Sequence, residues 1–178
     1  MSTVTQTFSH TPWWVLAIAG FLVYRGIQAG RPNTTRVLRL FVVPAVFLCW
    51  GGSILATRYA ISVGNCMLWA AFLLIGGFVG HLSVHNEAIL ADHDRGVISR
   101  PGDRTYLPLL IVAFLTNYAF ATIAAIHPSW LASPGCALLN IAVAAHMAGI
   151  FLGKAVTLTR KYAATSHTSL PVGNVIAA

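Results

Sequence analysis

Two adjoining stretches decide the fold: GNCMLWAAFLLIGGFVGHLSVHN (residues 64–86) and EAILADHDRGVISRPGDRT (residues 87–105). The first is an apolar run long enough to cross a bilayer, because a spanning helix needs about 20 mostly apolar residues. The second holds all four acidic residues of the chain, Glu87, Asp92, Asp94 and Asp103, together with three arginines. A nearly uncharged span beside a charged loop indicates a membrane protein whose polar chemistry lies near its helix ends.

Other apolar runs repeat the first pattern, at residues 13–30, 38–57, 106–126 and 135–157. With 57% hydrophobic and 8% charged residues, the chain cannot cover a soluble core with a polar surface. We therefore predict an all-α integral membrane protein, with one domain of five transmembrane helices over residues 1–162. Residues 163–178 are rich in Ser, Thr and Ala, and we expect them to form a disordered cytoplasmic tail.

Every Lys and Arg except Arg58 lies at one set of helix ends. This asymmetry follows the positive-inside rule and predicts that the N-terminus is outside and the C-terminus cytoplasmic. The excess of Arg over Lys, with abundant Ala and Gly, points to a bacterial inner (cytoplasmic) membrane. The net charge of +7 then becomes a basic rim that attracts anionic lipid headgroups, and nucleic acid is excluded as a partner.

Local signals add detail to this topology. Turn residues flank Val97–Ser99, so the cytoplasmic segment 87–105 is either a short charged hairpin or a solvated loop. Pro44 should kink the helix at 38–57. Small residues recur at helical spacing in two of the runs and predict close packing between them, or a dimer face in a homo-oligomer or larger membrane complex. These residues are Gly76, Gly77, Gly80, Ala145, Gly149 and Gly153.

The histidines allow a cofactor hypothesis. His81 and His146 lie in two different apolar runs, and as axial ligands they would bind a b-type haem between two helices. The pairing requires the helix at 64–86 to continue toward Ile89. If that helix ends near Val84, His81 lies about 12 Å from the bilayer centre at 1.5 Å per residue, and the pairing fails.

A second hypothesis is a transition metal at the cytoplasmic rim. His81 and His85 are spaced i, i+4 and share one helix face, and Glu87 or His93 would complete the ligand set. In the third interpretation each histidine is neutral and donates to a nearby carbonyl oxygen, with no cofactor.

Other polar residues within the runs define a candidate substrate pathway: Arg25, Asn117, Asn140 and His146. Arg25 either extends its side chain to the headgroups or pairs inside the bundle, with Glu87 or an anionic substrate group. Asn117 and Asn140 either hold helices together or line a pathway. Cys66 and Cys136 are either unpaired thiols or a disulfide on the outer side.

No phosphate loop, nucleophile elbow or catalytic triad pattern is present, so we predict no catalytic residues. The leading hypothesis is a non-enzymatic binding, transport or accessory component, with a polar site among the third, fourth and fifth spans. The alternative is a haem- or metal-binding redox protein that uses the histidines within the membrane.

Two segments carry a family resemblance. Arg36 and Arg39 lead into Pro44, and DHDRGVISRPG (residues 92–102) precedes a helix with Asn117-Tyr118. Over residues 12–125 the chain resembles a group of small bacterial inner-membrane proteins of uncharacterised function, loosely similar to the CcdC-like proteins linked to cytochrome c biogenesis. The resemblance implies a haem or redox connection and supplies no catalytic residues.

Overall fold

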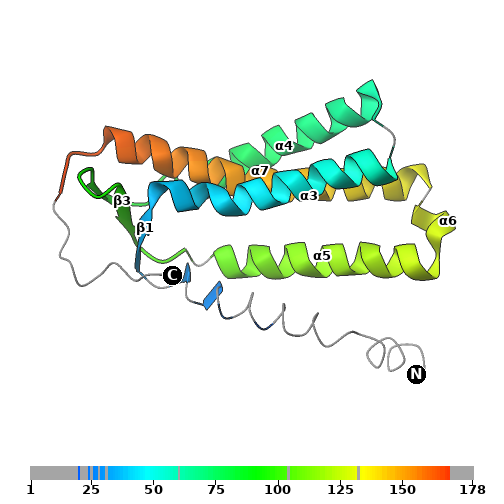
Figure 1. Cartoon of the computed structure of the whole chain (residues 1–178), viewed down its shortest axis with the longest axis horizontal. Helices are drawn as coiled ribbons and strands as arrows, with labels where there is room; N and C mark the ends of the chain where they lie inside the picture. The colour runs from blue at the N-terminus through cyan, green and yellow to red at the C-terminus, as the bar shows by residue number, and fades with distance from the viewer. Residues whose placement is uncertain are drawn as a thin grey trace.

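The computed structural model describes residues 32–59, 61–103, 105–131 and 133–168, and the isolated positions 20, 24, 26, 27, 29 and 30. Its elements are β1 (Asn33–Arg36), η1 (Val37–Phe41), α3 (Val42–Arg58), α4 (Val63–Val84), β2 (Leu90–Asp92), β3 (Val97–Arg100), α5 (Tyr106–Ile126), α6 (Pro128–Leu131) and α7 (Pro134–Ala164). Figure 1 shows α3, α4, α5 and α7 running along one long axis.

Four helical segments are long and apolar enough to cross a membrane, namely Val37–Arg58, Val63–Val84, Tyr106–Ile126 and Pro134–Ala164. They confirm the four corresponding sequence runs and are compatible with a multi-pass membrane protein. The run at 13–30 and Arg25 lie outside the described residues, apart from isolated positions. The five-span topology and its orientation therefore stay predictions.

Pro44 acts earlier in its helix than the sequence indicated. The chain forms a 3₁₀ turn over Val37–Phe41, and the α-helix begins at Val42. Pro44 thus lies in the first turn of α3, where an N–H group has no intrahelical acceptor, so the missing donor costs little. The chain changes from 3₁₀ to α geometry just before the proline, and a kink within the helix stays a prediction.

The helices α4 and α7 pack in parallel with their backbones in contact. A Cβ atom placed on Gly76 would collide with the His146 carbonyl, and one on Gly80 would collide with the Ile150 carbonyl. Gly153 meets the Gly77 carbonyl from the opposite side in the same way. The small-residue rows therefore serve as the surface between these two helices, which confirms the predicted close packing.

A three-stranded antiparallel sheet corrects the all-α prediction. The hairpin of β2 and β3 forms within the predicted segment, with Gly96 at φ 63° in its turn. Because only glycine adopts positive φ without strain, Gly96 permits this tight reversal. The first strand, β1, was not predicted; it pairs with β3 in the register Asn33↔Arg100 and gives the order β1-β3-β2.

The sheet closes one end of the bundle, which we call the sheet end; it comprises the sheet, η1, the last turns of α4 and α7, and the start of α5 (Figure 1). Val84, Ile98 and Leu158 form a buried core there, one residue each from α4, β3 and α7. Two segments distant in sequence meet at the same end, since the Asp103 N–H donates to the Ala29 carbonyl at 2.9 Å.

The folded chain continues beyond the predicted domain boundary at residue 162. The helix α7 runs to Ala164, and the Thr168 N–H then donates to the Ala91 carbonyl at 2.8 Å. The first residues of the predicted tail 163–178 therefore lie along the hairpin, and residues 169–178 lie outside the described part of the chain.

Candidate functional site at the sheet end

A buried ion pair is the main polar feature of the sheet end. Lys154 of α7 and Asp103 of the loop before α5 are 4% and 3% exposed, and Lys154 Nζ donates to Asp103 Oδ2 at 2.7 Å. Thr105 completes the arrangement: its hydroxyl accepts from Lys154 and donates to Asp103 Oδ1 at 2.6 Å. Lys154 lies within an apolar span, where an ionisable side chain is a functional-site candidate.

The two carboxyl groups beside Lys154 have opposite electrostatic environments. Burial alone would raise the pKa of Asp103, but hydrogen bonds from Lys154 and Thr105, with the charges of Lys154 and Arg100, lower it below its ordinary value. Burial raises the pKa of Glu87, and the nearby cations oppose this only in part. Glu87 Oε2 is buried and has no hydrogen-bond partner among the described residues. The site therefore contains two different carboxyl groups: Asp103 loses its proton more readily than usual, and Glu87 holds its proton more tightly than usual.

Lys161 lies about two helical turns beyond Lys154 on α7 and caps the end of α4. Its Nζ donates to the carbonyl oxygens of Val84 at 3.1 Å and Glu87 at 2.7 Å. The Val84 carbonyl is one that the C-terminus of α4 leaves without an intrahelical partner, and Glu87 lies in the loop that follows. The loop after α4 is thus attached to α7 at two successive points, Lys154 and Lys161.

His81 contacts Thr157, one turn beyond Lys154 on α7, and this hydrogen bond identifies the tautomer of the ring. The Thr157 hydroxyl donates to the Gly153 carbonyl at 2.7 Å and lies 3.0 Å from His81 Nδ1. Because the hydroxyl hydrogen is already used, Thr157 accepts from Nδ1–H. In the neutral ring the lone pair is therefore on Nε2. The side chain of His85, on the next turn, has its ring centroid 5.7 Å from that of His81.

The structure does not bring the proposed haem ligands together. The helix α4 ends at Val84, and His81 is level with Thr157 on α7. His146 lies at the level of Gly76, where the backbones of α4 and α7 are in contact, and Gly76 is five residues from His81, about 7.5 Å along the helix axis. Two axial ligands must approach one iron from opposite sides at similar depth, so His81 and His146 do not fit one haem in this arrangement.

The predicted metal set is also divided. His93 lies on the hairpin, where its Nε2 contacts the Thr165 carbonyl at 2.9 Å and its ring packs against Tyr162. The Glu87 carboxyl lies within the charge cluster. Of the four predicted ligands, only His81 and His85 are neighbours.

A separate group of possible ligands was not predicted from the sequence. The ligand atoms of Asp92, Asp94 and His167 lie within 4.8 Å of one another. The Asp94 side chain is 86% exposed and its carboxylate is 3.6 Å from His167 Nε2. His167 Nδ1 accepts from the His93 N–H at 3.3 Å, which leaves the hydrogen of the neutral ring on Nε2, directed toward the carboxylate. His167 and Asp94 therefore form an exposed contact between an imidazole and a carboxylate, at ion-pair distance.

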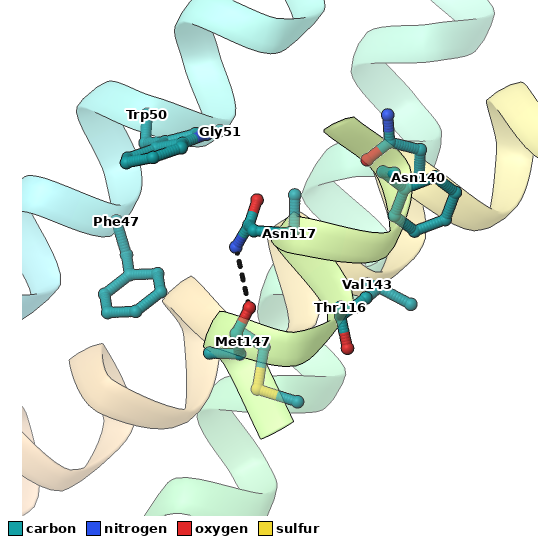
Figure 2. A pocket seen from close by; sticks show the side chains of 11 residues that line it. Phe47, Trp50, Gly51, Thr116, Asn117, Asn140, Val143 and Met147 are labelled. Carbon is teal, nitrogen blue, oxygen red and sulfur yellow. Dashed lines mark hydrogen bonds between the residues drawn. The ribbon is translucent and has the colours of Figure 1, made fainter. Parts of the chain in front are cut away.

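The predicted pathway residues lie elsewhere, between α3, α5 and α7. Asn117 of α5 and Asn140 of α7 line one small cavity there, and Figure 2 shows Trp50 and Phe47 of α3 facing Asn117. The volume open to the centre of a water molecule is about 10 Å³, enough for about one water. Asn140 Nδ2 donates to the Tyr59 hydroxyl at 2.9 Å. Asn140 therefore joins α7 to the end of α3, whereas Asn117 Nδ2 donates within α5 to the Ala113 carbonyl at 2.9 Å.

Two further sequence predictions can now be placed. His146 is half-buried and is not among the residues that line this cavity. Cys66 and Cys136 are both free thiols, which agrees with the first of the two alternatives for them.

One residue of the charge cluster is marked in the sequence. Lys154 interrupts the apolar run at 135–157, and that position alone marks it as unusual. Its partner could not be identified in this way, because Asp103 is 51 positions away and is one of four acids in a single loop.

Comparison of the chain with family models, curated proteins and solved structures gives no match. The resemblance to CcdC-like proteins therefore stays a prediction.

Proposed function

We propose that this chain is a non-enzymatic, multi-pass protein of the bacterial inner membrane that binds anionic lipid headgroups at its sheet end. Its role in this proposal is that of a binding or accessory component. The packed interior supports this role over transport through Asn117 and Asn140, because α4 and α7 are in backbone contact and the cavity beside those amides accommodates about one water.

The observation that carries the proposal is the distribution of cations along the bundle. The arginines and lysines that the structure describes belong to elements at the sheet end, except Arg58, which ends α3 at the opposite end. At the sheet end Asp103 is already paired with Lys154, and Asp94 lies beside His167. Arg36 and Arg160 are exposed and form no ion pair with any described residue. They are suited to contact phosphate groups of lipids.

The size of the expected preference for anionic lipid follows from the charge of these side chains. A basic side chain close to an anionic membrane surface contributes about 1 kcal/mol. Replacing both Arg36 and Arg160 therefore removes about 2 kcal/mol, roughly a 30-fold loss of preference for anionic lipid. The interaction is also screened by salt, since the Debye length falls from about 10 Å at 0.1 M to about 3 Å at 1 M.

The test compares lipid retention by native mass spectrometry of the purified protein in mixed micelles of phosphatidylglycerol and phosphatidylcholine. We expect wild type to retain phosphatidylglycerol preferentially, and Arg36→Gln/Arg160→Gln to lose most of that preference. Arg58→Gln, at the opposite end, is the matched control and should behave as wild type. Equal selectivity in the double variant and wild type would refute the proposal, as would an equal loss in Arg58→Gln.

A separate experiment tests the orientation of the protein in the membrane. The positive-inside rule places the sheet end in the cytoplasm, so a green fluorescent protein fused after residue 178 should fluoresce and alkaline phosphatase at the same position should be inactive. An active phosphatase fusion would place the sheet end outside and contradict this part of the proposal.

A further inference from the structure

We propose that His81 and His85 form a binding site for a divalent transition metal ion at the end of α4. This site is distinct from the lipid-binding surface and does not depend on it. The two imidazoles are one helical turn apart, their ring centroids are 5.7 Å apart, and both side chains are exposed. Side chains at i and i+4 project from one helix face, so both rings can bind the same ion.

The hydrogen bond to Thr157 prepares His81 for this role. A histidine that binds a metal through one ring nitrogen usually donates the hydrogen on the other nitrogen to a fixed acceptor. His81 has this arrangement already, because Nδ1–H donates to Thr157 and the Thr157 hydroxyl is itself fixed by the Gly153 carbonyl. The Nε2 lone pair is thereby available, and the ring is oriented by α7.

The local charge has two opposing contributions. His81 lies in the last turn of α4 and His85 follows its final residue, where the helix dipole favours a cation. Lys161, one turn beyond Thr157 on α7, is a cation that disfavours a bound metal ion, but its Nζ is directed at the carbonyl oxygens of Val84 and Glu87. Imidazole ligands suit zinc, copper and nickel, and water would occupy the remaining coordination positions.

Thr157 provides the decisive variant, because Thr157→Val keeps the shape of the side chain and removes the acceptor. Loss of such a supporting hydrogen bond typically weakens metal binding 10- to 100-fold. Thr157→Ser keeps the hydroxyl and should bind as wild type does. Because neither change alters a ligand, a difference between them reports the positioning of His81.

The experiment measures Zn²⁺ binding by calorimetry on the detergent-purified full chain, and Cu²⁺ coordination by electron paramagnetic resonance. We expect one ion per chain and hyperfine coupling to two nitrogens. His81→Ala and His85→Ala should each abolish binding, Thr157→Val should weaken it 10- to 100-fold, and His127→Ala, at the opposite end of α5, should leave it unchanged. Nitrogen-15 spectra of the metal-free protein should show His81 protonated on Nδ1.

The following results would overturn the proposal. They are the absence of binding in wild type, binding that persists in His81→Ala or His85→Ala, and equal affinity in Thr157→Val and Thr157→Ser. Loss of binding in Asp94→Asn alone would instead assign the ion to the group of Asp92, Asp94 and His167, and would equally refute a site at His81. The lipid selectivity of His81→Ala should match wild type, which separates this test from that of the lipid-binding proposal.

Discussion

Removing one partner of the Lys154–Asp103 pair should destabilise the protein strongly. Both side chains are almost fully buried, at 5% and 3% exposure. Lys154→Met leaves a buried carboxylate whose remaining cation, Arg100, is 3.9 Å away, and Asp103→Asn leaves a buried ammonium without a carboxylate partner. Breaking a buried ion pair in this way costs about 3–5 kcal/mol. Replacing both partners removes both desolvation penalties, so the double variant should recover most of that loss.

The assay is a double-mutant cycle on unfolding free energies, obtained by titrating mixed micelles with dodecyl sulfate and following helix content. Asp94→Asn is the matched control, because its pair with His167 is exposed and such pairs contribute about 0–1 kcal/mol. The folded-state pKa of Asp103 is lowered, so the pair contributes stability above the ordinary value of 3.8 and loses it as the pH falls through the folded-state pKa.

Two results would contradict this reasoning. If Lys154→Met were as stable as wild type, Asp103 would not be a buried charge that needs a partner. If the double variant were no more stable than the worse single variant, the two residues would act independently and the cycle would show no coupling.

Three other perturbations have defined outcomes. Gly76→Ala forces a methyl group against a carbonyl of α7 and should cost about 1–3 kcal/mol in the same unfolding assay. Gly52→Ala, with no atom within 4 Å of the new Cβ, should be neutral or slightly stabilising. Equal effects of the two changes would refute the contact between α4 and α7. The folded-state pKa of Glu87 is raised above 4.5, so ionisation of this carboxyl disfavours the folded state. The stability of Glu87→Gln relative to wild type should therefore increase as the pH rises above 4.5. A stability difference that does not change with pH would argue against burial of the carboxyl. Tyr59→Phe removes the partner of Asn140 and should cost about 0.6 kcal/mol, as is typical of interhelical hydrogen bonds in membranes; a loss of several kcal/mol would show a larger role.

The sequence by itself determined the helical segments. An apolar run long enough to span a bilayer must satisfy its own backbone hydrogen bonds, and it does so as a helix. The predicted run 106–126 coincides with α5, Tyr106–Ile126. Glycine spacing likewise predicted the contact between α4 and α7, because close backbone approach in lipid needs small residues on both surfaces. Turn residues around Val97–Ser99 predicted the hairpin as one of two alternatives, since their conformational preferences are local.

The tertiary structure decided the contacts between segments far apart in sequence. β1 has no strong strand signal of its own, and it forms because η1 and the hairpin place Asn33–Arg36 beside β3. Asp103, among four acids in one loop, is the partner of Lys154 because the loop before α5 closes over α7. The histidines illustrate the same difference between local and long-range contacts. Sequence spacing makes His81 and His85 neighbours on one helix. The position of His81 relative to His146 along the bundle depended on where α4 ends and on how α7 aligns with it.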